Sequence, residues 1–251
     1  MNGRTRLYAL AATLTFLLMG GCTAGGDITR PIPTAYYPAP HATQRVVVML
    51  PGRGDDLASL EKRHAAALIQ AQWPDADVIL TGLTMPFYRQ GHAPQRLHDE
   101  VIEPLLEAHP KRPVWLLGIS LGGMGALLYD RRYPEQAAGL LLLSPYLGDR
   151  PIHREIRAAG GLESWRPGPA EPMTEATFQR ELWRYLHGWA DTPHRTRTVW
   201  ITYGANERFR KPITLLKPVL PQGHLLERPG YHNWNLWKPA IAPLLQRANK
   251  D

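Results

Sequence analysis

The sequence has few of the residues that cross-link a chain or extend it into a fibre. Cys22 is the only cysteine among 251 residues, so a disulfide bond within the chain is impossible. No heptad, glycine triplet or other repeat of fixed period runs through it, which excludes coiled-coil and collagen folds. The 44% content of hydrophobic residues predicts one globular domain with a full-sized core.

The basic residues do not form a nucleic-acid-binding pattern. Lys and Arg number 29 against 22 Asp and Glu, which gives a formal net charge of +7. These residues are scattered and lack the aromatic interleaving of an RNA-binding surface, so we expect no nucleic-acid partner. A solvated basic surface is the simplest interpretation, and attraction to anionic lipid head groups is the alternative.

Residues 1–21 have the three parts of a secretory signal peptide. Arg4 and Arg6 form a positive start, the run from Leu7 to Met19 is apolar, and two small residues follow. The apolar run is shorter than the roughly 20 residues that cross a hydrocarbon core. We therefore expect a cleaved signal rather than a transmembrane helix.

The end of this segment, Met19-Gly20-Gly21-Cys22, resembles the lipobox of bacterial lipoproteins. The resemblance implies cleavage before Cys22, lipidation of that cysteine with fatty acids such as palmitate, and an anchor on the periplasmic side of a membrane of the bacterial cell envelope. An ordinary signal peptide and a secreted or periplasmic product form the alternative. Residues 22–44 are rich in glycine and proline, so we expect them to form a tether to a domain at 45–251.

From Arg45 onward, short apolar runs alternate with longer amphipathic stretches. The expected strands are Arg45–Leu50, Asp77–Leu80, Val114–Leu117, Leu140–Leu143, Val199–Tyr203 and His224–Glu227. The expected helices are Asp55–Gln72, Ala93–His109, Leu121–Tyr133, Lys211–Val219 and Trp234–Arg247. This order predicts an α/β fold with a doubly wound, mostly parallel sheet of about six strands, flanked by helices. The active site is then expected at the carboxyl ends of the strands.

The segment at about 148–197 is longer than a crossover needs, and we expect it to be a helical cap insertion. Its apolar residues recur at helical spacing: Phe178, Leu182, Tyr185, Leu186 and Trp189. This apolar face either packs on the main domain or covers the pocket, with Trp165, Trp183 or Trp189 touching the substrate.

The clearest chemical motif is Gly118-Ile119-Ser120-Leu121-Gly122, which lies between an expected strand and an expected helix. It is Gly-x-Ser-x-Gly in the context that marks a nucleophile. A serine in a sharp, strained turn needs neighbours without side chains, and Gly118 and Gly122 meet that need. The chain has only four serines, so the pattern seldom arises by chance; a spectator serine in a glycine-rich turn is the alternative.

The motif and the strand–helix order from Arg45 to Arg247 resemble the α/β-hydrolase superfamily. The resemblance implies that Ser120 is the nucleophile of a Ser, acid, His triad in that chain order, with two backbone N–H groups as the oxyanion hole. The two antiparallel strands that often open this fold are not visible, because Thr34 to Ala39 is too rich in proline to count as a strand.

The turn Leu50-Pro51-Gly52-Arg53 looks like the family's His-Gly turn, with Pro51 in place of histidine. The resemblance assigns the oxyanion donors to the N–H groups of Arg53 and Leu121.

The resemblance also selects the base and the acid. The loop Gly230-Tyr231-His232-Asn233-Trp234 is similar to the Gly-x-His-x-Trp loop of many hydrolases, so His232 is the expected base and His224 the alternative. Glu207 lies three residues past a glycine after a buried strand, where the family carries its acid; Asp149 is the alternative.

The resemblance implies a serine hydrolase, a carboxylesterase in particular, that cleaves a small-molecule or lipid ester through an acyl-enzyme. An acyltransferase with the same triad and a catalytically inert, surface-anchored binding protein are the alternatives. We expect no cofactor and no metal. His92 and His98 do not match a metal-site spacing and are expected to be solvated.

Overall fold

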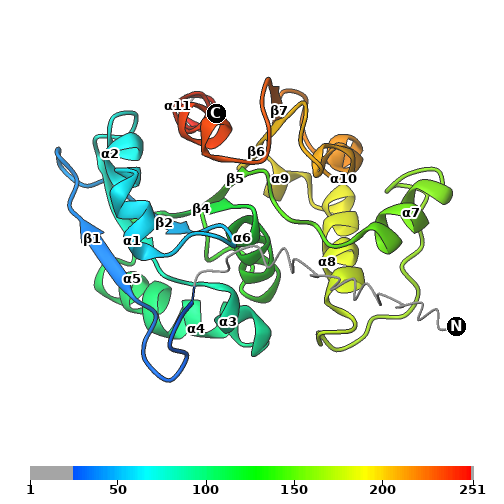
Figure 1. Cartoon of the computed structure of the whole chain (residues 1–251), viewed down its shortest axis with the longest axis horizontal. Helices are drawn as coiled ribbons and strands as arrows, with labels where there is room; N and C mark the ends of the chain where they lie inside the picture. Colours follow the sequence, from blue (N-terminus) through cyan, green and yellow to red (C-terminus); the bar gives the residue numbers. More distant parts are fainter. Residues whose placement is uncertain (1–24, 250–251) are drawn as a thin grey trace, which may run out of the picture.

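The computed structural model of the chain describes residues 25–249. The predicted signal peptide and the predicted lipidation site Cys22 lie outside these residues. Figure 1 shows a central sheet with helices on both of its faces. Within residues 25–249, no helix combines the length and the apolar character that crossing a membrane requires.

The sheet has seven strands in the described residues, in the order β1-β3-β2-β4-β5-β6-β7. They are β1 (Thr34–Tyr37), β2 (Arg45–Leu50), β3 (Ala76–Thr81), β4 (Val114–Ile119), β5 (Gly139–Leu143), β6 (Val199–Gly204) and β7 (Leu225–Arg228). Every neighbouring pair is parallel except β1 with β3. The predicted α/β fold with a mostly parallel, doubly wound sheet is confirmed.

The prediction that Thr34 to Ala39 contains no strand is wrong. Thr34–Tyr37 pairs antiparallel with β3 and forms one edge of the sheet, with Thr34 opposite Thr81. Pro33 and Pro38 flank the strand. An edge strand forms hydrogen bonds on one side only, so nearby prolines cost it few hydrogen bonds. The proline content was therefore a poor reason to reject the strand. Residues 34–37 also lie within the tether predicted at 22–44, so the part of that prediction that covers them is wrong: they belong to the sheet.

The helices along the chain are α1 (Leu57–Lys62), α2 (Ala65–Gln70), α3 (Met85–Arg89), α4 (Ala93–Leu97), α5 (Glu103–Ala108), α6 (Leu121–Arg132), α7 (Arg150–Ala158), α8 (Phe178–His187), α9 (Pro193–Thr196), α10 (Arg210–Ile213) and α11 (Trp234–Ala248). Shorter helical turns are η1 (His98–Ile102), η2 (Gly188–Asp191) and η3 (Thr214–Val219).

Three expected helices are each divided. His64 has a left-handed backbone with φ of +56° and separates α1 from α2. A π-helical turn, η1, joins α4 to α5. The helix expected over Lys211–Val219 is divided into α10 and the 3-10 turn η3, which contains Pro218.

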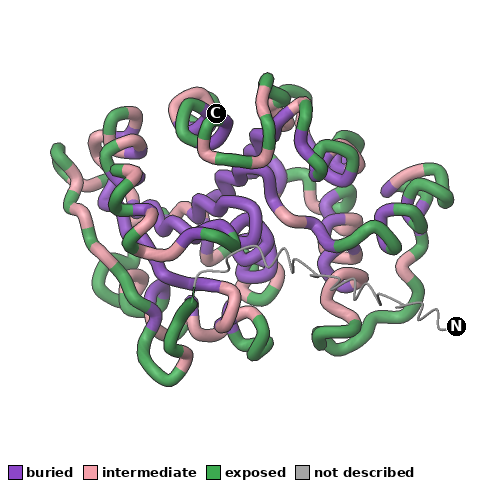
Figure 2. The backbone as a smooth tube through the Cα atoms, viewed as in Figure 1, coloured by how far each residue is buried: buried purple, intermediate pink, exposed green. Residues whose placement is uncertain are grey.

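Two apolar cores lie on the two faces of the sheet. Successive residues of a strand point to opposite faces, and β2 shows this: Val46 and Val48 belong to one core, Val47 and Met49 to the other. Residues of α4, α6 and α8 complete the first core, and residues of α1, α2 and α11 complete the second. Figure 2 shows the buried backbone concentrated in the central strands and α6.

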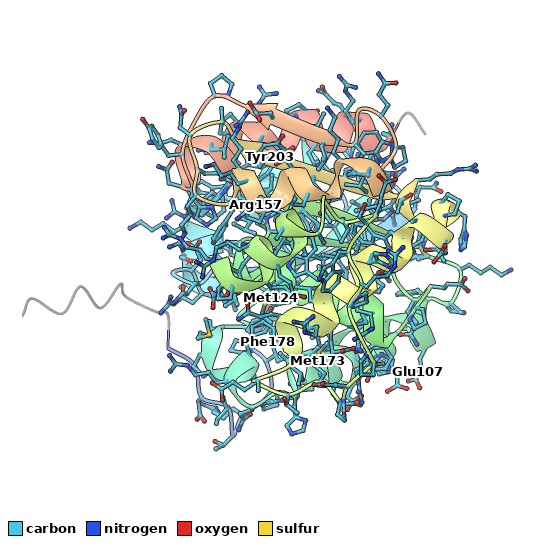
Figure 3. The ribbon with its side chains drawn as sticks, turned by 90° about the vertical axis from the view of Figure 1, so that its right-hand side faces the viewer. Glu107, Met124, Arg157, Met173, Phe178 and Tyr203 are labelled. Carbon is cyan, nitrogen blue, oxygen red and sulfur yellow. The ribbon has the colours of Figure 1, made fainter. Side chains whose placement is uncertain are left out.

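The segment between β5 and β6 carries α7 and α8 on the right-hand side of Figure 1. Figure 3 views this side directly, with Phe178 at the start of α8. Trp165, Trp183 and Trp189 are at most 1% exposed and share one core with the main domain. The apolar face of α8 therefore packs on the main domain, and these three indoles are core residues rather than substrate contacts.

Candidate active site

Ser120 occupies a strained turn between β4 and α6. Its backbone has φ of +51° and ψ of −106°, a conformation that residues other than glycine rarely adopt. A Cβ atom on Gly118 would lie 2.4 Å from the carbonyl oxygen of Gly122, and one on Gly122 would lie 2.3 Å from the carbonyl oxygen of Leu50. The backbone packs so closely here that neither glycine can carry a side chain.

The structure brings Ser120, His232 and Glu207 together. His232 Nε2 lies 2.9 Å from Ser120 Oγ, and His232 Nδ1 lies 3.3 Å from Glu207 Oε2. The three residues follow β4, β7 and β6, so they meet at the carboxyl edge of the sheet. The Glu207 carboxylate can accept a hydrogen bond from the Nδ1–H group of His232, which leaves Nε2 free to accept the serine proton.

The two alternative residues lie in other surroundings. His224 is buried at the start of β7, where its Nδ1 is 2.9 Å from the Val199 carbonyl oxygen and its ring stacks on Trp200. Asp149 is exposed at the start of α7, and its carboxylate accepts hydrogen bonds from Tyr146 and Gln179. None of these four contacts involves Ser120 or His232.

The histidine ring and the acid have partners that sequence reasoning missed. The His232 ring packs edge-to-face against Phe209 and Trp237, at centroid distances of 4.6 Å and 4.9 Å. The Trp237 indole N–H also donates to Ser144 Oγ at 3.0 Å, and Ser144 Oγ donates to Glu207 Oε2 at 2.7 Å. Trp237 thus contacts the His232 ring directly and is linked to Glu207 through Ser144. The only sequence signal for Ser144 was its position directly after a buried strand.

The turn Leu50-Pro51-Gly52-Arg53, which carries the predicted oxyanion donor Arg53 (the oxyanion turn), packs directly on the strained turn at Ser120 (the serine turn). A Cβ on Gly122 would meet the carbonyl oxygens of both Leu50 and Pro51, so the chain leaving β2 touches the start of α6. Leu121 is the first residue of α6, where a helix leaves its N–H groups unused. Within residues 25–249, the backbone N–H groups of Leu121 and Arg53 have no hydrogen-bond acceptor in the protein, so both are available to an oxyanion.

Asp55 fixes the oxyanion turn to the loop that carries His232. This carboxylate is 6% exposed and accepts from the indole N–H of Trp234 at 2.9 Å and 3.1 Å, and from Ser59 Oγ at 3.1 Å. Asp55 lies two residues after Arg53, and Trp234 lies two residues after His232. Sequence reasoning did not single out this pair.

Tyr146 lies beside the candidate nucleophile. Its backbone N–H donates to the Ser120 carbonyl oxygen at 2.9 Å, and its ring packs against Phe209. Burial raises the pKa of its phenol, and the hydrogen bond to Asp149 acts in the same direction. The phenol therefore stays protonated at neutral pH.

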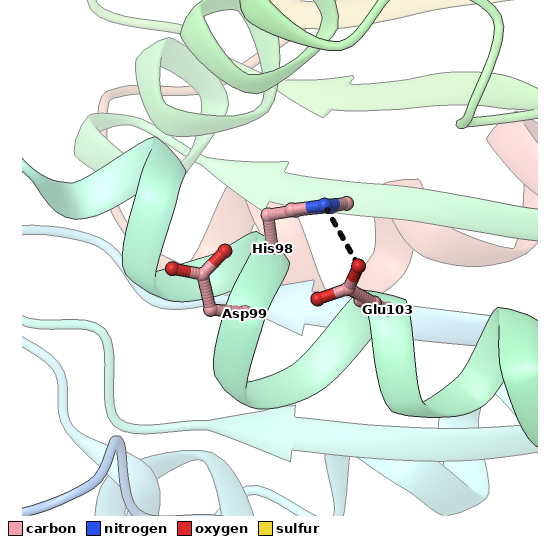
Figure 4. A group of neighbouring side chains, drawn as sticks. All are labelled: His98, Asp99 and Glu103. Atoms are coloured by element: carbon pink, nitrogen blue, oxygen red, sulfur yellow. Dashed lines mark ion pairs between the residues drawn. The ribbon is translucent and has the colours of Figure 1, made fainter.

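One group of possible metal ligands occurs in the described residues: His98, Asp99 and Glu103, drawn in Figure 4. The expectation that His98 is solvated is wrong, because its side chain is only 12% exposed and stacks on Tyr133 at 4.0 Å. Its Nδ1 lies 3.3 Å from Tyr129 Oη, and its Nε2 lies 3.8 Å from Glu103. Both ring nitrogens thus have protein partners, and this arrangement is that of a packed histidine.

One protein-family model matches part of the chain. A model of the family described as "Serine aminopeptidase, S33" matches residues 97–181, which include Ser120. No curated protein matches the chain.

Solved structures match over most of their length. A ferulic acid esterase is 15% identical, with a TM-score of 0.57 over 83% of this chain and 85% of that one. S-formylglutathione hydrolase from Staphylococcus aureus is 13% identical, with a TM-score of 0.58 over 89% and 99%. Monoacylglycerol lipase from Paleococcus ferrophilus is 17% identical, with a TM-score of 0.53 over 87% and 100%. With the strand order and the serine turn, these likenesses show that the chain has the fold of the α/β-hydrolase superfamily.

Proposed function

We propose that the protein is an extracytoplasmic serine hydrolase that cleaves carboxylic esters through an acyl-enzyme on Ser120. The observation that carries this proposal is the hydrogen-bonded series Ser120, His232 and Glu207, with distances of 2.9 Å and 3.3 Å. The esterase and lipase activities named for the structural neighbours support an ester substrate.

In the proposed reaction, Ser120 Oγ attacks the ester carbonyl carbon while His232 Nε2 takes the hydroxyl proton. The carbonyl oxygen becomes an oxyanion, which accepts hydrogen bonds from the N–H groups of Arg53 and Leu121. His232 then gives the proton to the departing alcohol. Water, activated by the same imidazole, cleaves the acyl-enzyme and releases the acid. Glu207 keeps the proton on Nδ1 and stabilises the imidazolium.

The oxyanion hole has a defined energetic role in this reaction. One such donor typically lowers the barrier by about 3 to 4 kcal/mol, because its dipole is already oriented where negative charge develops. Both proposed donors are backbone groups, so replacing the Arg53 or Leu121 side chain leaves the donor in place.

Hydrolysis of a panel of nitrophenyl esters of increasing acyl length tests the proposal. We expect turnover by the full chain and its loss in Ser120→Ala. Ser164→Ala is the matched control, because Ser164 is an exposed serine outside the site. Equal turnover by Ser120→Ala and the unchanged chain would contradict the proposal. Adding alcohols separates hydrolysis from acyl transfer, since an acyltransferase forms new esters at the expense of free acid.

The proposed location rests on the lipobox-like sequence before Cys22. We propose that the mature chain begins at a lipidated Cys22 and is anchored on the periplasmic side of the bacterial cell envelope. Intact-mass analysis of the membrane fraction tests this: the expected product lacks residues 1–21 and carries acyl groups. A chain that retains Met1 or an unmodified Cys22 would contradict it.

A further inference from the structure

A cavity of about 340 Å³ lies between the end of α1 and the start of α11. Its lining residues are Ser59, Lys62, Arg63, Trp234 and Lys238. Trp234 and Lys238 are four residues apart on α11 and so share one helix face. Three of the five lining residues are cationic, and none of the five belongs to the candidate triad.

The carboxylates that contact this lining are already engaged. Asp55 accepts from Trp234 and Ser59, as described above, and Asp56 accepts from the Ser59 N–H at 2.8 Å as the N-cap of α1. Within residues 25–249, neither Lys62 nor Lys238 forms an ion pair. The ammonium groups of these two lysines therefore keep their hydrogen-bonding capacity for another partner.

Arg63 is held in place at the same cavity. Its guanidinium carbon lies 4.5 Å from the centroid of the Trp234 ring, and its Nε lies 3.5 Å from Asp55 Oδ1. Stacking on an indole orients the planar guanidinium without using its outer N–H groups. Those groups suit an oxyanion with several acceptor oxygens.

We propose that this cavity binds a phosphate-type oxyanion, either free or as the head group of an anionic lipid. Lys62 and Lys238 supply charge from the two helices, and Arg63 supplies oriented donors over Trp234. The site is separate from the candidate triad. It is nevertheless joined to the His232 loop, because Trp234 both lines the cavity and donates to Asp55. The proposal concerns binding alone, so it does not depend on the proposed esterase activity.

Calorimetric titration of the full chain tests this site, with inorganic phosphate in one arm and short-chain phosphatidylglycerol monomers in the other. Ionic strength is held constant with chloride, and short-chain phosphatidylcholine is the control head group without net charge. The test variant is the Lys62→Gln, Lys238→Gln pair. The matched control is the Lys111→Gln, Lys217→Gln pair, which removes the same charge from exposed lysines outside the cavity.

We expect saturable binding with one ligand per chain, weakened at least about tenfold in the test pair and unchanged in the control pair. Saturation with inorganic phosphate identifies a free oxyanion as sufficient, whereas saturation with phosphatidylglycerol alone identifies the lipid head group. Absence of saturable binding in both arms would overturn the proposal. Equal weakening in the two lysine pairs would also overturn it, since it would reflect net charge rather than a site.

Discussion

The Ser144 hydroxyl donates a hydrogen bond to Glu207 Oε2 at an oxygen–oxygen distance of 2.7 Å, and both side chains are buried. Ser144 also has a positive φ of 49°, so the end of β5 is strained at the point where it touches the candidate acid. The carboxylate is thus held by two groups, the Ser144 hydroxyl and the His232 imidazole.

Ser144→Ala is expected to slow turnover without changing substrate affinity. The substitution removes one hydrogen bond to Glu207 and leaves the Trp237 indole N–H without its acceptor. Loss of such a buried partner costs about 1 to 3 kcal/mol of folding free energy. We expect kcat to fall about tenfold with KM unchanged, measured by steady-state kinetics. A variant with unchanged kcat would show that this contact is structural only.

Glu207→Gln is expected to lower kcat more than Ser144→Ala does. Glutamine keeps the shape of the side chain, but it lacks the charge that stabilises an imidazolium and can present N–H to Nδ1. Replacing the acid of such a triad with its amide lowers kcat by up to about 10⁴-fold. The measurement is kcat at neutral pH, with Glu227→Gln as the exposed control. Glu207→Gln turnover close to that of the unchanged chain would remove Glu207 from the proposed triad.

Gly122→Ala is expected to destabilise the fold. The new Cβ would lie 2.3 Å from the Leu50 carbonyl oxygen, so the turn must shift away from β2, at a cost of about 1 to 3 kcal/mol or more. Gly188→Ala is the matched control, because it has a helical backbone and no atom within 4 Å of the added Cβ. Chemical denaturation should show a loss of unfolding free energy for the first variant and none for the second. Equal stability of the two would contradict the close packing of the serine turn.

Folding stability should fall as the solution is acidified below pH 6.5. Burial lowers the pKa of His153, whose Nε2 lies 2.9 Å from the Leu147 carbonyl oxygen. The unfolded chain then binds a proton at this site more readily than the folded chain, so the contribution is complete above the unfolded pKa of about 6.5 and is lost as pH falls. The free energy of unfolding measured from pH 7.5 to 5 should decline less steeply in His153→Gln. An unchanged slope would exclude His153 as its source.

The strands were predictable because β2 to β6 are buried on both faces and therefore read as continuous apolar runs. The edge strand β1 is only partly buried and lies between prolines, so it gave no such signal. The break at His64 was also hidden, because a left-handed histidine has no distinctive sequence pattern.

The candidate site could be predicted only where it follows a local pattern. Ser120, Glu207 and His232 each lie in a loop with glycine at a recognisable distance. Ser144 and Trp237 carry no such mark, and their hydrogen bond joins residues 93 positions apart. Tertiary contacts of this kind depend on the order of the strands, which local patterns do not specify.

Covalent labelling with a fluorophosphonate, followed by peptide mapping, tests the central claim most directly. The account predicts one label per chain, located on Ser120, with none in Ser120→Ala and reduced labelling in His232→Gln. The Ser164→Ala control should label like the unchanged chain. A folded chain that takes up no label, or that carries it on a residue other than Ser120, would contradict the account.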